Sequence, residues 1–191
     1  MIFIIIGCIA FIFLYIFDLN KIVFLHRNIN ICFAVGLLLL VFSTMGILLG
    51  SFENFEVSIS LQLFFGAMSI SSLLLIIYSL FFALPFGKTY IEVEKGNTVV
   101  DTGMYSLCRH PGVIWFFFFY LFLWLASGKM MIMWAGIIWT GMDIVHVYVQ
   151  DRWLFPKNLN GYDSYKNKVP FLVPNLAGIK KSISSLHCCS R

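Results

Sequence analysis

Long apolar runs alternate with short polar segments along the chain. A membrane hydrocarbon core of about 30 Å needs about 20 helical residues, because each residue adds about 1.5 Å to a helix. The third apolar run exceeds this length, so its helix must tilt, kink or project from the membrane. The pattern predicts about five transmembrane helices, over residues 2–17, 30–50, 57–86, 111–127 and 130–150.

The composition agrees with this interpretation. Of the 191 residues, 60% are hydrophobic and only 12% are charged, whereas soluble domains average roughly 25% charged residues. We therefore expect an all-α integral membrane bundle, formed as a single membrane domain over residues 1–191. The net charge of +4 gives no reason to expect a nucleic-acid partner, because the basic residues are spread over loops and tail.

We expect no processing of either end. The first run has no basic residue before it and no small-residue cleavage site before Asp18, so a retained span is expected. The pair Cys188 and Cys189 lacks the two aliphatic residues of a prenylation motif. The five cysteines of the chain show neither a CxxC pair nor a metal-ligand spacing, so no metal site is expected.

The distribution of positive charge predicts an orientation in the membrane. With the N-terminus outside, every lysine and arginine except Lys129 faces the cytosol. Cytosolic loops carry the excess of Lys and Arg in multi-pass proteins. The polar loop 87–110 and the polar tail 151–191 then share the cytosolic face, where we expect a site for a water-soluble ligand.

A polar segment leads directly into the aromatic run that begins at residue 111. Arg109 and His110 precede Pro111, and proline suits a first helical turn because its missing amide would have no partner there. The helix start leaves free N–H groups and a partial positive charge. We expect an anion-binding site at this membrane boundary. The alternative is that Arg109 and His110 only anchor the helix to lipid headgroups.

A second group of polar residues lies in the last apolar run. Asp143, His146 and Gln150 fall within about 60° on one helical face. A carboxylate within a span is costly and faces the bundle interior or a wet cavity. The functional hypothesis is that this stripe lines a pocket shared with Arg109 and His110. The alternative is a structural Asp–His contact that holds the helix to a neighbour.

Three segments, in order along the chain, resemble motifs of one enzyme family. TGMYSLCRHP (Thr102 to Pro111) resembles the GxYxxxRHP motif of the isoprenylcysteine carboxyl methyltransferases and the related phospholipid N-methyltransferases. Gln150 to Leu154 stands where that family has EExxL, and GYDSYKNKVPFLVP (Gly161 to Pro174) resembles its eYxxYkkrVPxxiP. The resemblance covers about residues 98–174, and the five-span layout is compatible with it over the rest.

The resemblance implies an integral-membrane methyltransferase that uses S-adenosyl-L-methionine. In that family the cofactor lies in a cytosolic pocket formed by the last two membrane helices, the loop before them and the tail. A lipid-like or prenylated substrate enters from the bilayer, and its acceptor group would be an isoprenylcysteine-like carboxylate, a phospholipid amine or a thiol. The implied cofactor-binding residues are Asn97, Thr98, Val99, Val100, Tyr105, Arg109, His110, Gln150 and Asp151.

The resemblance also places a substrate contact. An arginine that contacts the substrate carboxylate in the prenylcysteine enzymes falls at His146. Methyl transfer is an in-line displacement that needs alignment and exclusion of water rather than a nucleophilic side chain. An amine acceptor would need a base to keep it neutral, and the candidates are His146 and Asp143.

Two further hypotheses stay open. The family's Glu-Glu pair is Gln150–Asp151 here, which motivates a non-catalytic membrane scaffold or sensor that keeps the methyltransferase fold. Asp143 within a span prompts a small transporter or channel, which we rank last because the chain has no internal repeat. The methyl acceptor and the oligomeric state are left open by these patterns.

Overall fold

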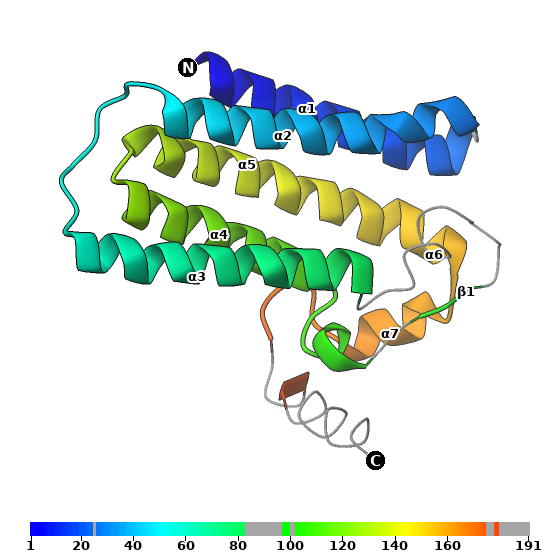
Figure 1. Cartoon of the computed structure of the whole chain (residues 1–191). Helices are drawn as coiled ribbons and strands as arrows, with labels where there is room; N and C mark the ends of the chain where they lie inside the picture. Colours follow the sequence, from blue (N-terminus) through cyan, green and yellow to red (C-terminus); the bar gives the residue numbers. More distant parts are fainter. Residues whose placement is uncertain (25, 83–96, 100–101, 175–177, 180–191) are drawn as a thin grey trace. The chain divides into compact units, whose positions relative to one another are not determined.

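The structure is a computed structural model, and it describes residues 1–24, 26–82, 97–99, 102–174 and 178–179. Two compact units make up the chain, and each is built from two stretches of sequence (Figure 1). Unit 1 consists of Met1–Leu73 and Phe116–Gln150, and unit 2 of Leu74–Trp115 and Asp151–Arg191. The expected single membrane domain over residues 1–191 stays a prediction, and each unit is described by itself below.

The described chain is almost entirely helical, as the apolar pattern predicts. Among the described residues, four helices are long and apolar enough to cross a membrane: Ile2–Leu19, Asn28–Leu49, Ile59–Phe82 and Met130–Asn158. The expected span 111–127 is the shorter apolar helix Pro111–Ser127. The expected long run 57–86 forms a helix that begins at Ile59, and its last four residues lie outside the described part. An all-helical protein with several apolar helices is thereby confirmed.

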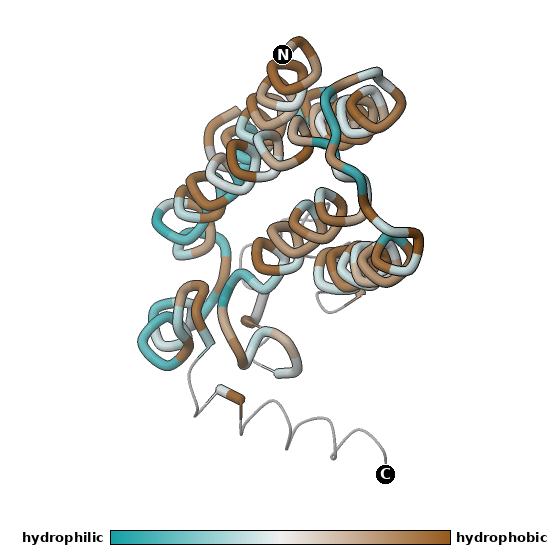
Figure 2. Tube along the Cα trace, turned by 90° about the vertical axis from the view of Figure 1, so that its left-hand side faces the viewer, coloured by the Kyte–Doolittle hydropathy of each residue, from teal (hydrophilic) through white to brown (hydrophobic). Residues whose placement is uncertain are grey.

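Unit 1 is a bundle of long apolar helices. Its members are α1 (Ile2–Leu19), α2 (Ile31–Leu49), most of α3 (Ile59–Ile77), most of α4 (Pro111–Ser127) and α5 (Met130–Val149). Helix α1 packs along both α2 and α5. The core between them contains fully buried Phe11, Ile47 and Trp139. Hydrophobic residues predominate along these helices (Figure 2), and many lie on their exposed faces, a pattern that fits a multi-pass membrane protein.

Hydrogen bonds join the helices of unit 1 at a few buried points. The Trp139 indole donates to the Ile4 carbonyl at 3.1 Å, and the Tyr120 and Thr44 hydroxyls share a bond of 2.8 Å. Ser69 on α3 donates to the Phe119 carbonyl on α4 at 3.2 Å. These bonds satisfy polar groups that are buried between neighbouring helices, away from water.

The turn between α4 and α5 meets the segment after α2. Gly128 in this turn has φ +69°, and an added Cβ would collide with the Phe55 carbonyl. The Phe55 amide donates to the Gly128 carbonyl at 3.0 Å, and the Lys129 ammonium donates to the Gly50 carbonyl at 2.6 Å. These bonds hold the two connections together at one end of the unit 1 bundle.

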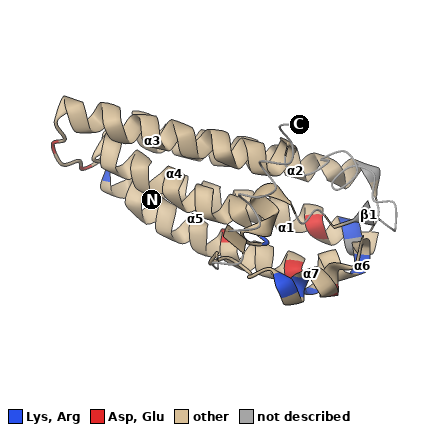
Figure 3. Ribbon diagram, turned by 90° about the horizontal axis from the view of Figure 1, so that it is seen from below, with Lys and Arg blue, Asp and Glu red and all other residues tan. Residues whose placement is uncertain are grey.

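Unit 2 consists of short elements. These are η3 (Tyr78–Phe82), β1 (Asn97–Thr98), η5 (Gly103–Ser106), nearly all of the π-helical turn η6 (Gln150–Leu154), α6 (Phe155–Asn158), β2 (Leu159–Asn160) and α7 (Tyr162–Lys168). Strands β1 and β2 pair in parallel, with Asn97 opposite Leu159. Tyr162, Tyr165 and Val169 form its buried core. Charged residues are sparse on the long helices and more frequent on α6 and α7 (Figure 3).

Candidate functional site

Among the described residues, each unit contains a buried group of polar side chains that includes a carboxylate and a histidine. The Asp151 cluster of unit 2 consists of Arg109, His110, Asp151, Tyr162 and Lys166. The Asp18 cluster of unit 1 consists of Tyr15, Asp18, His146 and Gln150. Buried polar groups are retained where they are paired, and such pairs fix the geometry of a site. The two clusters are the candidates for function.

The segment before α4 brings Arg109 and His110 into the Asp151 cluster. The Tyr165 hydroxyl of α7 donates to the Tyr105 carbonyl at 2.6 Å, and the Tyr105 hydroxyl donates to the Ser79 carbonyl at 3.0 Å. The Arg109 amide donates to the Pro170 carbonyl at 2.9 Å. The segment therefore is held from both sides before Pro111 starts α4.

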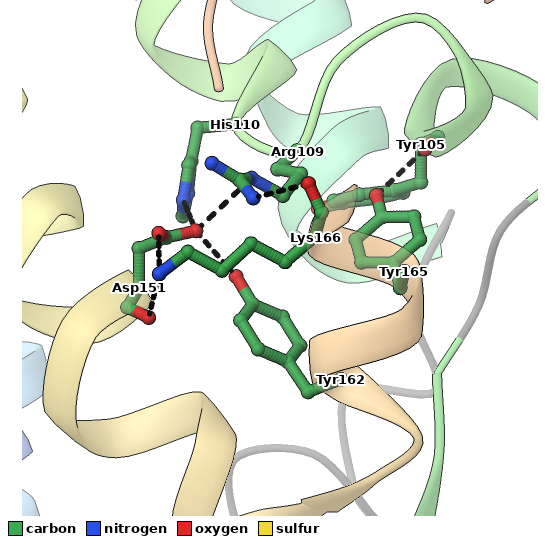
Figure 4. Close-up of polar contacts among 7 residues, drawn as sticks. All are labelled: Tyr105, Arg109, His110, Asp151, Tyr162, Tyr165 and Lys166. Atoms are coloured by element: carbon green, nitrogen blue, oxygen red, sulfur yellow. Dashed lines mark hydrogen bonds and ion pairs between the residues drawn. The ribbon is translucent and has the colours of Figure 1, made fainter. Parts of the chain in front are cut away.

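Asp151 is the centre of its cluster (Figure 4). One carboxylate oxygen, Oδ1, accepts a 2.6 Å hydrogen bond from the Tyr162 hydroxyl and forms a 3.1 Å ion pair with Arg109 Nε. His110 Nε2 lies 3.4 Å from the same oxygen. The other oxygen, Oδ2, lies 3.0 Å from the Lys166 ammonium. Donors from two segments, residues 109–110 and residues 162–166, thus converge on one carboxylate.

The cluster has more positive than negative charge. Asp151 supplies its one carboxylate, whereas Arg109 and Lys166 are both cationic and His110 can take up a proton. The side chain of Arg109 is 8% exposed and that of Lys166 is 30% exposed. Arg109 also donates from Nη1 to the Lys166 carbonyl at 3.0 Å. This surplus of positive charge suits an additional anionic group, such as a ligand carboxylate.

Aromatic rings enclose His110. The Phe155 ring lies 6.0 Å away and nearly parallel to the imidazole, and the Phe171 ring meets it edge-on at 5.0 Å. The Arg109 guanidinium lies 5.7 Å from the centre of the Phe171 ring. Rings of this kind exclude water and interact favourably with a planar or cationic ligand group.

The surroundings of the cluster keep two nearby acids protonated. Burial, and next the hydrogen bond to the Asp151 carboxylate, raise the pKa of the Tyr162 hydroxyl above its ordinary value. Burial raises the pKa of the Cys108 thiol to about 11. Tyr162 therefore acts as a hydrogen-bond donor to Asp151 at neutral pH, and Cys108 is a neutral, buried thiol rather than a nucleophile.

The Asp18 cluster joins the end of α1 to the end of α5. Asp18 Oδ2 lies 2.6 Å from His146 Nε2 and accepts a 2.8 Å hydrogen bond from Gln150 Nε2. The Tyr15 ring meets the imidazole edge-on at 4.9 Å. Asp143 is close enough to interact electrostatically with His146, and its carboxylate makes no hydrogen bond within the described part of the chain. His146 and Gln150 thus share one helical face, as their spacing predicts.

The residues expected to bind the cofactor do not all lie in one cluster. Arg109, His110 and Asp151 meet in the Asp151 cluster, whereas Gln150 contacts Asp18. Neighbouring residues on a helix point about 100° apart, so Gln150 and Asp151 reach different partners.

Of the other residues expected to bind the cofactor, those that the structure describes lie in unit 2. Tyr105 bonds through its carbonyl and hydroxyl, Asn97 and Thr98 form β1, and Val99 packs against the Tyr162 core. Val100 lies outside the described residues. No group of three or more metal-ligating side chains is gathered in the described ranges.

Tyr15, Asp18, Tyr162 and Lys166 are members of the two clusters that were not among the site residues expected from the sequence. Asp18 follows the first apolar run, and its partner His146 lies in the last apolar run, more than a hundred residues away. Lys166 follows Tyr162 by four residues, the spacing that places two side chains on one face of a helix. That spacing within YDSYKNK was the available signal for Lys166; no local signal linked Asp18 to its partners.

Comparison of the chain with protein-family models, with curated proteins and with solved structures finds no match. A functional assignment therefore rests on the motif residues, on their convergence in the Asp151 cluster, and on the chemistry that the cluster can perform.

Proposed function

We propose that the protein is an integral-membrane methyltransferase that transfers the methyl group of S-adenosyl-L-methionine to a membrane-borne amphiphilic acceptor. The cofactor would bind at the Asp151 cluster. The acceptor group would be an isoprenylcysteine-like carboxylate, a phospholipid amine or a thiol, presented by a lipid-like or prenylated molecule from the bilayer.

One observation carries this proposal. The three segments that resemble methyltransferase motifs each supply a side chain to the Asp151 cluster, although Asp151 is 41 residues from His110 and 11 from Tyr162 in the sequence. Arg109 and His110 come from the first, Asp151 from the second, and Tyr162 and Lys166 from the third. Motifs that met by chance would have no reason to converge on one buried carboxylate.

The residues of the cluster fit the cofactor. S-adenosyl-L-methionine carries a carboxylate, an ammonium and a sulfonium group. Arg109 and His110 suit the carboxylate, because the cluster has a surplus of positive charge. Asp151 suits the ammonium, and the Phe155 and Phe171 rings suit the sulfonium or the adenine.

The bound cofactor would supply an activated methyl group. The chain's own contribution is to bind and orient the cofactor and to exclude water, and the aromatic enclosure of His110 serves the last purpose. The candidate bases for an amine acceptor, His146 and Asp143, belong to unit 1, where the Asp18 carboxylate lies 2.6 Å from His146 Nε2 and orients the imidazole.

The proposal includes five spans with the N-terminus outside and the tail in the cytosol. The bonds between the α4–α5 turn and the segment after α2 support it, because five spans place both connections on the outer face. In that arrangement Lys129 is the one basic residue outside, in agreement with the charge rule.

Calorimetry of S-adenosyl-L-methionine binding to the detergent-solubilised full chain tests the proposal. We expect micromolar binding by the wild type and its loss in His110→Ala. The matched control is His26→Ala, because His26 lies in unit 1 and bonds to Asn20 through its backbone. Absence of binding by the folded wild type, or equal loss in both variants, would contradict a cofactor site at the Asp151 cluster.

A second candidate function is a non-catalytic membrane scaffold or sensor. The observation in its favour is that Gln150, which replaces an acidic residue of the family pattern, is engaged with Asp18. In this alternative the Asp151 cluster only stabilises the packing of three parts of unit 2: the segment before α4, η6 and α7. Transfer of a labelled methyl group into a lipid extract separates the two functions, since only the methyltransferase performs it.

A further inference from the structure

The two oxygens of the Asp151 carboxylate have very different partners. Oδ1 faces Tyr162, Arg109 and His110, whose side chains are all buried or nearly buried. Oδ2 is paired with Lys166, whose side chain is 30% exposed and ends in a freely rotating ammonium. One oxygen is therefore held by rigid, enclosed donors, and the other by a group at the edge of the cluster.

The Lys166 ammonium occupies a small cation site. Its nitrogen lies 3.0 Å from Asp151 Oδ2 and 3.5 Å from the Asp151 carbonyl oxygen. A carboxylate oxygen and a carbonyl oxygen that face the same point form a suitable receptor for any –NH₃⁺ group. The position therefore has the chemistry that a primary ammonium on a ligand would need.

Lys166 can leave this position without disturbing the fold around it. Its helix, α7, is fixed by Tyr162 and Tyr165, which are 3% and 7% exposed. The Lys166 backbone is retained separately, since its carbonyl accepts the hydrogen bond from Arg109 Nη1. A partly exposed lysine ion pair is weak, because ordering the long side chain offsets most of the attraction. Displacement requires rotation of one side chain only.

We propose that Lys166 is an internal competitor of the cofactor: its ammonium occupies the place on Asp151 that the ammonium of S-adenosyl-L-methionine takes when it binds. This inference rests on the proposed function. While the Lys166 ammonium is paired with Asp151, it lowers the apparent affinity for ligands that carry an ammonium group. Ligands without this group do not compete with Lys166.

Affinity measurements on two lysine variants test the inference. Lys166→Met removes the competing ammonium, and Lys168→Met is the matched control, because Lys168 lies on the same helix and is exposed. In the wild type, the weak ion pair gives comparable populations with the Lys166 ammonium on Asp151 and rotated away from it. Lys166→Met should therefore bind S-adenosyl-L-methionine roughly two- to sixfold more tightly than the wild type. Lys168→Met should bind as the wild type does.

A second ligand distinguishes displacement from a general change in charge. 5′-Methylthioadenosine keeps the adenosine and the sulfur but lacks the ammonium, so its affinity should be the same in the wild type and in Lys166→Met. Thermal unfolding of each variant shows whether it is folded. A gain for both ligands, or for Lys168→Met as well, would overturn the inference.

The reactivity of the lysine amine gives a direct readout. Saturation with S-adenosyl-L-methionine should raise the acetylation rate of Lys166 by roughly two- to sixfold, as measured by mass spectrometry, and leave that of Lys168 unchanged. Binding of the cofactor with no gain in affinity or reactivity at Lys166 overturns the inference and leaves the proposed function standing. No binding of S-adenosyl-L-methionine by either the folded wild type or Lys166→Met overturns both.

Discussion

At the scale of single residues, Tyr162 is the closest donor to the Asp151 carboxylate, at 2.6 Å. We expect Tyr162→Phe to lower the free energy of unfolding by about 1–3 kcal/mol, because a buried charged acceptor loses one donor. Thermal or denaturant unfolding in detergent at pH 7 measures this loss. A difference within a few tenths of a kcal/mol would mean that the remaining donors satisfy Asp151.

The same hydroxyl makes this effect depend on pH. Burial and the neighbouring Asp151 raise the pKa of Tyr162 in the folded protein. Its contribution to stability is therefore full below the unfolded pKa of about 10 and decreases as the pH rises above that value. The stability difference between the wild type and Tyr162→Phe should be constant from pH 7 to pH 9 and shrink towards pH 11.

Gln150 is a residue at which the family pattern and the structure lead to opposite expectations. Gln150→Glu introduces the acidic residue found at this place in the motif that the segment resembles, but Gln150 donates to Asp18 at 2.8 Å. The change would place two carboxylates together in a buried position, so we expect a loss of about 1–3 kcal/mol in the free energy of unfolding at neutral pH.

A second substitution provides the control for Gln150→Glu. Adding Asp18→Asn exchanges the two roles, because an amide on α1 then faces a carboxylate at the start of η6. We expect the double variant to recover part of the lost stability, measured as the coupling free energy of a double-mutant cycle. Additive losses would show that Asp18 and Gln150 do not interact in the folded protein.

At the scale of elements, the close approach of α1 and α5 depends on Gly7. The residue is buried on α1, and an added Cβ would collide with the Trp139 ring on α5. Trp139 is itself fixed by its bond to the Ile4 carbonyl. We therefore expect Gly7→Ala to cost about 1–3 kcal/mol through overpacking, as measured by the midpoint of thermal unfolding.

The matched control for Gly7 is another helical glycine in unit 1. Gly66 on α3 has open space around an added Cβ. Gly66→Ala should leave stability unchanged or raise it by up to about 1 kcal/mol, because alanine forms helix better than glycine. Equal effects of the two substitutions would show that helix propensity, rather than the contact with Trp139, decides the outcome.

The helices themselves could be predicted from the sequence because long apolar runs between short polar segments are typical of helices that can cross a membrane. The expected bounds 111–127 and 130–150 differ from α4 and α5 by at most one residue. Polar Ser127, Gly128 and Lys129 between two apolar runs mark that turn. The short elements of unit 2 lack such periodicity, and β1, β2 and α7 depend on contacts between distant segments.

Part of the candidate site could also be predicted from the sequence. Arg109, His110 and Asp151 lie in segments that resemble motifs of one family, and this resemblance led us to expect them close together, as they are in the structure. The direction in which Gln150 points could not be predicted, because it depends on the partner that α1 offers. Asp18 supplies that partner, and a carboxylate at the end of an apolar run has many alternative explanations.

At the scale of the whole molecule, the number of spans decides which connections face each other across the membrane. Glu56 lies before α3, and Lys168 ends α7. Three spans separate these residues if α4 crosses the membrane, and two separate them if it does not. An odd number places Glu56 and Lys168 on opposite sides, so one labelling experiment tests both the count of five and the orientation.

We expect Glu56→Cys to react with a membrane-impermeant maleimide on intact cells, giving one label more than the wild type. Lys168→Cys should gain its additional label only after permeabilisation, because the charge distribution places the tail in the cytosol. Both positions are exposed, so a missing label reports on topology rather than burial. Reaction of both on intact cells would mean that α4 does not cross. The reverse pattern would invert the orientation, and the Asp151 cluster would then face away from the cytosolic supply of S-adenosyl-L-methionine.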